Sequence, residues 1–251
     1  GSMLPLGHQD STPDGCRCPI LADDLLYERP EVPLRLAAVA IAIDSQRRVL
    51  LTRRPRTMRT FPGAWVLPGG AADATDKSLM ATALRELEEE TGIRGSCDES
   101  ASPLCLWESC YPVSFSGWQQ ARSAGEREAH SLIAFMVVPL SDDEAFSSLA
   151  LQRGECDAAC WVPLDDVAGK LCHEGATAAQ QPASGESDGA GGSEHMYACQ
   201  TLGAGSSQLE DDTMAASRLA GVYPNAHHGE GIGRGHLFAL RQLALADASS
   251  S

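Results

Sequence analysis

One short stretch, ALRELEEETGI at residues 83–93, constrains the fold and chemistry of this chain more than any other. Its apolar residues recur at helical spacing and Gly92 is a typical left-handed C-cap, so we predict a helix over about residues 77–91. Glutamates crowd the C-terminal end of that helix, where the peptide dipoles already concentrate negative charge and each acid costs roughly 0.3–1 kcal/mol. The sequence therefore predicts that a positively charged group or ion binds beside these glutamates.

The glutamates gather on one side of this helix. At about 100° per residue, Glu86, Glu89 and Glu90 share a narrow sector. Arg85 precedes Glu89 by one turn and can hold its carboxylate. The sector borders an apolar stripe expected to face the core, which consists of Met80, Ala83, Leu84, Leu87 and Thr91. Three clustered carboxylates indicate a divalent cation such as Mg²⁺, which prefers oxygen ligands and shares its coordination with substrate phosphates. A solvated acidic face is the plain alternative.

The loop before the helix favours the metal site over the solvated face. LPGG at residues 67–70, followed by RELEEETGI at 85–93, resembles the signature of the Nudix hydrolases, G-x5-E-x7-R-E-U-x-E-E-x-G-U with U aliphatic. The second half of this signature is complete. At the first box glutamate the chain has Asp76, and eight residues rather than seven separate it from Arg85. The same lengthening occurs in the coenzyme A diphosphatase branch, and it leaves the spacing of the metal-binding carboxylates unchanged.

This resemblance implies an α/β (α+β) Nudix fold, in which a mixed β-sheet is sandwiched between helices. It implies a site for Mg²⁺ or Mn²⁺ made by Glu86, Glu89, Glu90 and the carbonyl of Gly69, with Arg85 orienting a carboxylate. The expected reaction is attack of water on one phosphorus of a diphosphate linked to a group X. Members of the family differ over the general base. Here Glu89 and Glu90 are candidates, together with three carboxylates expected on distant loops, Glu126, Glu128 and Glu155.

The stretch LLTRRPRTMRTFPGAWVLPGG, residues 50–70, resembles two branches of the family. The vertebrate Nudix type 17 branch shares LLTRRxRT and WVxPGG, and the likeness continues in LWESCYP at 106–112 and in His130 before an apolar strand. That branch is described as hydrolysing nucleoside diphosphate conjugates, including the 7-methylguanosine cap of RNA. The expected partner is therefore a small nucleoside diphosphate conjugate or a capped RNA 5′ end.

Coenzyme A diphosphatase activity is the alternative, although Ala64 and Leu67 replace the Gln and Phe of that branch. A Nudix fold that only binds nucleotides is a third hypothesis, which the intact box disfavours.

One positive patch stands out in a chain with a formal net charge of −15. Six arginines lie between Arg47 and Arg59 with no acid among them. The patch suits a small polyanionic ligand, whereas the acidic remainder argues against a general nucleic-acid coat and against anionic membranes. Because arginine presents a bidentate fork to phosphate, we expect phosphate contacts from Arg53, Arg54, Arg56 and Arg59.

Trp118, in a polar stretch, is the candidate for stacking a base, whereas Trp65 and Trp107 lie in apolar strands and are expected in the core.

Composition suggests the organisation of the rest. Residues 1–30 are predicted to form an arm that begins with an expression scar, and 31–246 a single Nudix domain with a low-complexity insertion at about 174–212. GEGIGRG at 229–235 is expected to be a flexible segment before a last helix. Strands are predicted at 35–43, 49–54, 64–67, 103–115, 129–140 and 156–164.

The longest apolar run, 36–43, is far shorter than the roughly 20 residues that span a bilayer. The nine scattered cysteines predict reduced thiols, so we expect a soluble cytoplasmic protein. The oligomeric state stays open.

Overall fold

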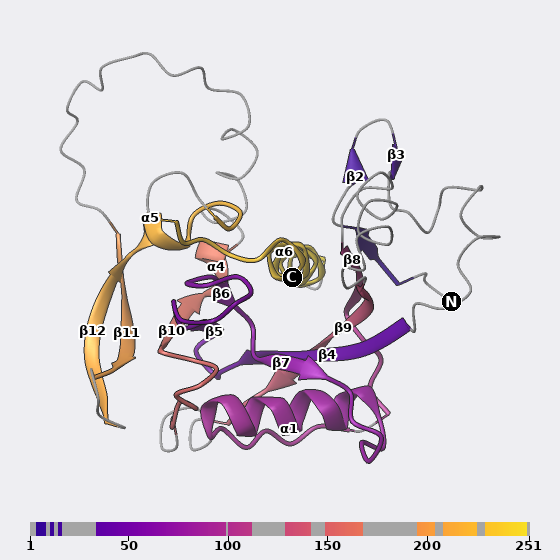
Figure 1. The fold of residues 1–251 in the computed structure, drawn as a ribbon, viewed down its shortest axis with the longest axis horizontal. Coiled ribbons are helices and arrows are strands. Elements are labelled where there is room, and N and C mark those ends of the chain that lie inside the picture. The colour runs from indigo at the N-terminus through magenta and orange to yellow at the C-terminus, as the bar shows by residue number, and fades with distance from the viewer. Residues whose placement is uncertain are drawn as a thin grey trace.

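A mixed β-sheet with helices on both faces organises the molecule (Figure 1). The computed structural model describes residues 4–8, 11–12, 15–16, 34–98, 100–111, 129–141, 149–167, 195–203, 208–224 and 229–249. The strands are β1 (Leu6–His8), β2 (Ser11–Thr12), β3 (Gly15–Cys16), β4 (Leu34–Ile43), β5 (Arg48–Arg53), β6 (Trp65–Val66), β7 (Gly69–Ala71), β8 (Cys105–Tyr111), β9 (Ala129–Pro139), β10 (Ala158–Pro163), β11 (Met196–Leu202) and β12 (Leu209–Ala215). The helices are α1 (Leu79–Thr91), α4 (Leu164–Asp166), α5 (Ala216–Leu219) and α6 (Arg234–Ala248).

The main sheet has the strand order β1-β8-β9-β4-β5-β10-β11-β12, with β7 paired to β4 and β6 to β5. Two of its pairings are parallel, β1 with β8 and β4 with β9, and the others are antiparallel. In Figure 1, α1 covers one face of this sheet and α6 lies over the other. This arrangement confirms the predicted fold class, a mixed sheet sandwiched between helices.

The residues of β4 explain why both faces of the sheet are covered. Side chains alternate between the faces of a strand, so Ala38, Ala40 and Ala42 belong to the core under α1, whereas Val39 and Ile41 belong to the core under α6. Because alanine side chains are short, the helix can lie close to this face of the strand. The predicted stripe on α1 is confirmed, since its residues are buried or half-buried against this face.

Both ends of α1 are capped by the residues at its boundaries. The Ser78 hydroxyl accepts a hydrogen bond from the Ala81 N–H at 3.1 Å. Gly92 has a left-handed backbone with φ 74°, and its N–H donates to the Glu88 carbonyl at 2.8 Å. The helix predicted over 77–91 is therefore confirmed within two residues.

The last part of the sheet differs from the expectation of a long insertion. Strand β11 and the beginning of β12 fall inside residues 174–212, while 168–194 lie outside the described residues. Tyr197 and Cys199 are buried and alternate with exposed Met196 and Ala198, which is the period of a strand. The Gly- and Ser-rich composition around this hairpin concealed that alternation. The predicted arm likewise contributes β1, which pairs with β8.

Other predictions about the core agree with the structure. Trp65 and Trp107 are buried in the core under α6, as expected. Among the described residues, no disulfide forms at Cys97, Cys105, Cys156, Cys160 or Cys199. In the part of the chain that the structure describes, every helix is too short or too polar to cross a membrane.

Candidate metal and active site

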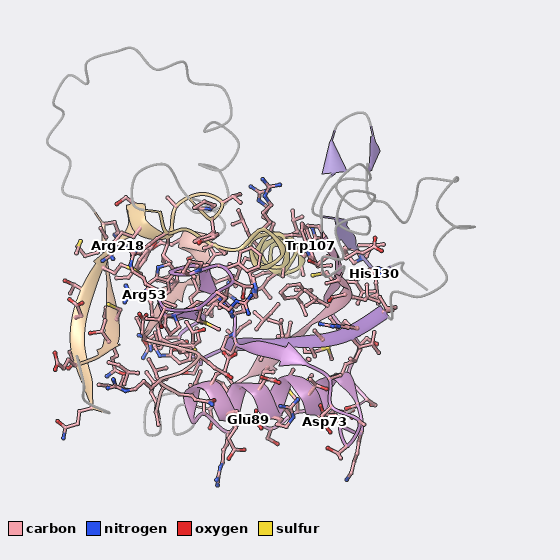
Figure 2. The ribbon with its side chains drawn as sticks, in the orientation of Figure 1. Arg53, Asp73, Glu89, Trp107, His130 and Arg218 are labelled. Carbon is pink, nitrogen blue, oxygen red and sulfur yellow. The ribbon has the colours of Figure 1, made fainter. Side chains whose placement is uncertain are left out.

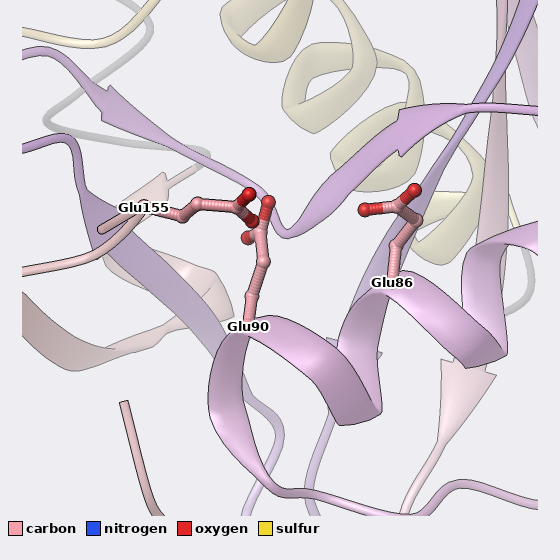
Figure 3. A group of neighbouring side chains, drawn as sticks. All are labelled: Glu86, Glu90 and Glu155. Carbon is pink, nitrogen blue, oxygen red and sulfur yellow. The ribbon is translucent and has the colours of Figure 1, made fainter. Parts of the chain in front are cut away.

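Three carboxylates from two separate segments meet beside α1. Glu86 and Glu90 lie one helical turn apart, and Glu155 lies in the turn before β10. One oxygen from each of the three lies within 4.8 Å of the others. Figure 3 shows Glu86 and Glu90 projecting from the helix, with the Glu155 side chain pointing towards Glu90. The structure thus brings two of the predicted metal ligands together with one of the predicted distant bases.

Hydrogen bonds to the end of α1 hold Glu155 in this position. The Ala150 N–H donates to the Thr91 carbonyl at 2.7 Å, and the Gln152 N–H donates to the Glu90 carbonyl at 2.9 Å. These carbonyls belong to the last turn of the helix, which has no further helical N–H groups to satisfy them. The turn closes when Glu155 N–H donates to the Gln152 carbonyl at 2.9 Å. The segment that carries Glu155 is therefore attached to the residue that carries another site carboxylate.

The two glycines of LPGG leave space that any side chain would fill. A Cβ on Gly70 would lie 2.6 Å from the carboxylate of Glu86, and a Cβ on Gly69 would lie 2.6 Å from the Ala38 carbonyl oxygen. Both distances are too short for real atoms, so only glycine permits this approach of β7 to α1 and β4. Two adjacent glycines after a strand favour a tight turn or a close approach of another group, and the structure shows the close approach.

The backbone of β7 also directs polar groups at the site. Ala40 N–H donates to the Pro68 carbonyl, and Ala72 N–H donates to the Leu36 carbonyl. In an antiparallel ladder the bonded pairs alternate, so the N–H and carbonyl of Gly69 point away from β4. The Gly69 N–H accordingly hydrogen-bonds to the Glu90 carboxylate. Its carbonyl, the backbone ligand predicted from the sequence, points to the same side.

Arg85 connects the carboxylates of the helix with the loop before it. One guanidinium nitrogen, Nη1, donates to Glu86 at 2.8 Å and to Glu89 at 3.0 Å. The Nε and Nη2 atoms each donate to Asp76 at 3.1 Å. This geometry fits the expected orienting role of Arg85. Glu89 is 53% exposed, and it is not one of the three carboxylates that meet within 4.8 Å.

Asp76 occupies the one position where the sequence departs from the family signature. Its carboxylate also accepts hydrogen bonds from the Asp73 N–H and the Thr82 hydroxyl, both at 2.9 Å. The hydrogen bonds from Arg85, followed by that from Asp73, hold its pKa well below the usual range. An aspartate is one carbon shorter than a glutamate, and here it still reaches Arg85 from a loop that is one residue longer. The departure thus preserves an acid–arginine contact.

The electrostatics of the site call for a cation. Burial, followed by the nearby carboxylates of Glu155 and Glu86, raises the pKa of Glu90 to about 8. Burial also raises the pKa of Glu86. Buried carboxylates of like charge are stable together only when protonated or when a cation joins them. The three carboxylates and the Gly69 carbonyl are hard oxygen donors, so the donor set fits Mg²⁺ or Mn²⁺.

A thiol next to these carboxylates does not alter that fit. The Cys156 thiol donates to Glu90 at 3.7 Å. Burial, together with the charge of Glu90, raises the pKa of this thiol, so it stays protonated at neutral pH. Cys156 therefore contributes a weak hydrogen bond and no thiolate ligand.

The four arginines predicted to bind phosphate have different surroundings. Arg53 donates to Asp157 at 2.7 Å, and Arg56 donates to Glu230 at 2.8 Å. Arg54 donates to the carbonyl and hydroxyl oxygens of Thr60, both at 3.2 Å, and Arg59 is exposed. Sequence reasoning missed Glu230, whose only signal was a charged residue inside GEGIGRG. Trp118, Glu126 and Glu128 lie outside the described residues.

Comparisons with known proteins agree on one family. The family model of the NUDIX domain matches residues 33–181. The chain is 35% identical over 159 residues to the m7GpppN-mRNA hydrolase NUDT17 of Danio rerio, covering 60% of this chain and 50% of that protein. It is 33% identical over 172 residues to the human protein of the same name, covering 64% and 49%. The chain spans about half the length of these relatives.

A solved structure gives a weaker match. The MutT protein of Methanosarcina mazei Go1 matches at a TM-score of 0.37 and 24% sequence identity, covering 56% of this chain and 85% of that one.

Proposed function

Because this chain belongs to the Nudix family, whose domain model covers residues 33–181, we infer that it hydrolyses the diphosphate bond of a nucleoside diphosphate linked to a further group X. The observation that carries this inference is the meeting of Glu86, Glu90 and Glu155 within 4.8 Å, beside Gly70, whose lack of a side chain lets the Glu86 carboxylate lie against the backbone. A set of hard oxygen donors suits a divalent cation that can also contact a substrate phosphate.

We assign the residues of the site to separate tasks. Glu86, Glu90 and the Gly69 carbonyl would hold Mg²⁺ or Mn²⁺, with Glu89 as a further ligand from the exposed side. A bound ion of this kind supplies a Lewis acid and neutralises charge that develops on the phosphate oxygens. Arg85 orients Glu86 and Glu89 through its shared nitrogen. Glu155 reaches the site from another segment, so we assign it as the general base that takes the proton of the attacking water.

For the substrate we propose a 7-methylguanosine cap or a related nucleoside diphosphate conjugate. The support is the name of the relatives, m7GpppN-mRNA hydrolase, together with the LLTRRxRT stretch that resembles their branch. A panel of capped RNA, nucleoside diphosphate conjugates and coenzyme A, with products identified by mass, distinguishes the alternatives. Release of 7-methyl-GDP supports the proposal, and faster release of 4′-phosphopantetheine would replace it with coenzyme A diphosphatase activity. Tight nucleotide binding without hydrolysis at any Mg²⁺ or Mn²⁺ concentration would indicate a binding module.

Substitutions in the carboxylates test the assigned roles. We expect Glu155→Gln to lower kcat by roughly 10²–10⁴-fold, the usual contribution of a general base, with Mn²⁺ binding retained. Glu86→Gln and Glu90→Gln should weaken Mn²⁺ binding, measured by electron paramagnetic resonance, as well as turnover. Glu88→Gln is the matched control, because Glu88 is on the same helix but pairs with Arg94. Near-normal turnover in Glu90→Gln would sink the assignment.

A further inference from the structure

A second charged cluster centres on Glu230, a residue beyond the part of the chain that the NUDIX model matches. The side chain of Glu230 is fully buried, with 0% exposed. It accepts hydrogen bonds from Arg56 at 2.8 Å, from the Nε of Arg218 at 3.1 Å and from the indole of Trp65 at 3.2 Å. Arg53 lies 3.8 Å from the same carboxylate. One buried acid thus gathers two neighbouring arginines of the 47–59 stretch and a third, Arg218, that lies more than 150 residues later.

Two arginines share the one carboxylate of Glu230. Arg56 and Arg218 both donate to it, whereas Arg53 is paired with Asp157 at 2.7 Å. The charge of Asp212 also acts on Arg218. The side chains of Arg56 and Arg218 are 59% and 36% exposed. Both donate to the same oxygen of Glu230, so their guanidinium groups lie side by side at the surface. Glu230 offsets part of the repulsion between these two cations, and their exposed guanidinium groups can donate to a second anion at the surface.

An exposed aromatic residue projects from the same loop as Arg56. Phe61 is 64% exposed and has a backbone φ of 50°, a left-handed conformation that costs free energy in a bulky residue. The ring of Tyr223 contacts it edge-on at 6.0 Å, and the Tyr223 hydroxyl donates to the Pro62 carbonyl at 2.9 Å. The structure therefore keeps the Phe61 ring at the surface even though the backbone conformation of this residue is strained. Such a ring can stack with a nucleobase.

The loop and the cluster form one surface. The side chain of Arg56 passes within 3.7 Å of the position that a Cβ on Gly63 would take, two residues after Phe61. The segment carrying Glu230 is attached to β6, because Trp65 N–H donates to the Gly231 carbonyl at 2.9 Å and Gly233 N–H donates to the Trp65 carbonyl at 3.1 Å. The segment expected to be flexible, 229–235, is instead hydrogen-bonded to the sheet at these points.

A short segment of chain links this cluster to the carboxylate site. Asp157, the partner of Arg53, follows Glu155 by two residues, which limits their Cα atoms to a separation of about 7 Å. Figure 2 shows Arg53 and Arg218 towards the same end of the sheet.

We propose that Arg56, Arg218 and Phe61 form a nucleotide-recognition surface, in which the arginines bind phosphate oxygens and Phe61 stacks on the base. Glu230 is a positioning residue that aligns the two arginines. This proposal deepens the proposed function, because it names the part of the chain that holds the nucleotide. Two of its residues, Arg218 and Glu230, come from beyond the matched domain, so the C-terminal segment would take part in substrate recognition.

The test measures binding of GDP, 7-methyl-GDP and inorganic pyrophosphate to the full chain in EDTA, by calorimetry. Without divalent metal the carboxylate site repels phosphate, so binding reports on the arginines. We expect Arg56→Gln and Arg218→Gln each to raise every Kd by about tenfold, through loss of charge-assisted hydrogen bonds. Phe61→Asn should raise the nucleotide Kd by about tenfold and leave that of pyrophosphate unchanged. Asparagine tolerates the left-handed backbone, so this change removes the ring with little strain.

Two controls separate this surface from the hydrolytic site. Arg94→Gln removes an arginine that is 83% exposed and pairs with Glu88, and it should leave every Kd unchanged. Glu90→Gln should also leave binding in EDTA unchanged while turnover with metal falls. If nucleotides did not bind in EDTA, or bound equally well to Arg56→Gln, Arg218→Gln and Phe61→Asn, the surface would be purely structural. Absence of hydrolysis with intact binding would contradict only the proposed function.

Discussion

At the scale of single residues, the absence of a side chain matters as much as the presence of a carboxylate. Gly70 faces Glu86 so closely that one added carbon would touch its carboxylate. Gly154 lies next to another site residue, Glu155, and a Cβ there would meet no atom within 4 Å. The two glycines therefore differ in the room around them, although both lie within the candidate site.

This difference gives a matched pair of substitutions. We expect Gly70→Ala to displace the Glu86 carboxylate, because the new Cβ would lie 2.6 Å from it. Affinity for Mn²⁺ and kcat should both fall by at least about tenfold while the far-UV circular dichroism stays unchanged. Gly154→Ala should alter neither quantity. Equal metal affinity in the two variants would show that the contact between Gly70 and Glu86 has no role in forming the site.

At the scale of elements, α1 is attached to its surroundings at both ends. The loop before it is held by Asp76, which bonds Arg85, and the segment after β9 is held by the carbonyls of the last helical turn. The second attachment depends on backbone N–H groups and not on side chains. The helix is therefore the common support of the carboxylates on its own surface and of Glu155.

Removal of one backbone donor tests this second attachment. Gln152→Pro removes the N–H that donates to the Glu90 carbonyl at 2.9 Å, and we expect a loss of roughly 0.5–1.5 kcal/mol in the free energy of unfolding. Because Glu155 lies on the released turn, kcat should fall more than this stability loss suggests. Gln152→Ala keeps the N–H and should retain activity. The measurements are chemical denaturation and steady-state kinetics, and equal kcat in the two variants would contradict the attachment.

At the scale of the whole molecule, one buried histidine joins the layer of α6 to the loop before the site. The Nδ1 atom of His236 accepts a hydrogen bond from the Leu67 N–H at 3.1 Å, and its ring contacts Phe135 edge-on at 5.6 Å. Burial, followed by the charge of Arg54, lowers the pKa of His236 to about 4. The imidazole is therefore neutral in the folded protein, as its acceptor role requires.

This histidine predicts how stability depends on pH. In the unfolded chain His236 titrates near 6.5 and in the folded protein near 4, so between these values the unfolded state binds more protons. The free energy of unfolding should fall by on the order of 3 kcal/mol as the pH falls from 6.5 to 4, at about 1.4 kcal/mol per unit of pKa difference. His236→Asn keeps an acceptor for Leu67 N–H and cannot titrate. Its pH dependence, measured by urea denaturation, should be flatter across this range, and an equal slope would rule out His236 as the source.

Local patterns in the sequence were sufficient for the elements whose causes lie within a few residues. The periodicity and C-cap of α1, the apolar runs of β4 and β9, and the spacing of Arg85, Glu86 and Glu90 are all local features of the sequence. The same spacing indicated the family, which the NUDIX model confirms over residues 33–181. Two adjacent glycines also indicated that another group could approach the backbone closely here, because a side chain at Gly69 or Gly70 would collide with its neighbours.

Contacts between distant segments were decided by the tertiary structure. The sequence offered Glu126, Glu128 and Glu155 as distant candidates. Hydrogen bonds from residues 150 and 152 to the end of α1 place Glu155 beside Glu90, whereas Glu126 and Glu128 lie outside the described residues. The arginines of the 47–59 stretch were identified by composition, whereas their gathering by Glu230 depends on a segment more than 150 residues later. Spacing along the chain determines which groups share a helix face. Sheet pairing and loop paths determine which faces meet.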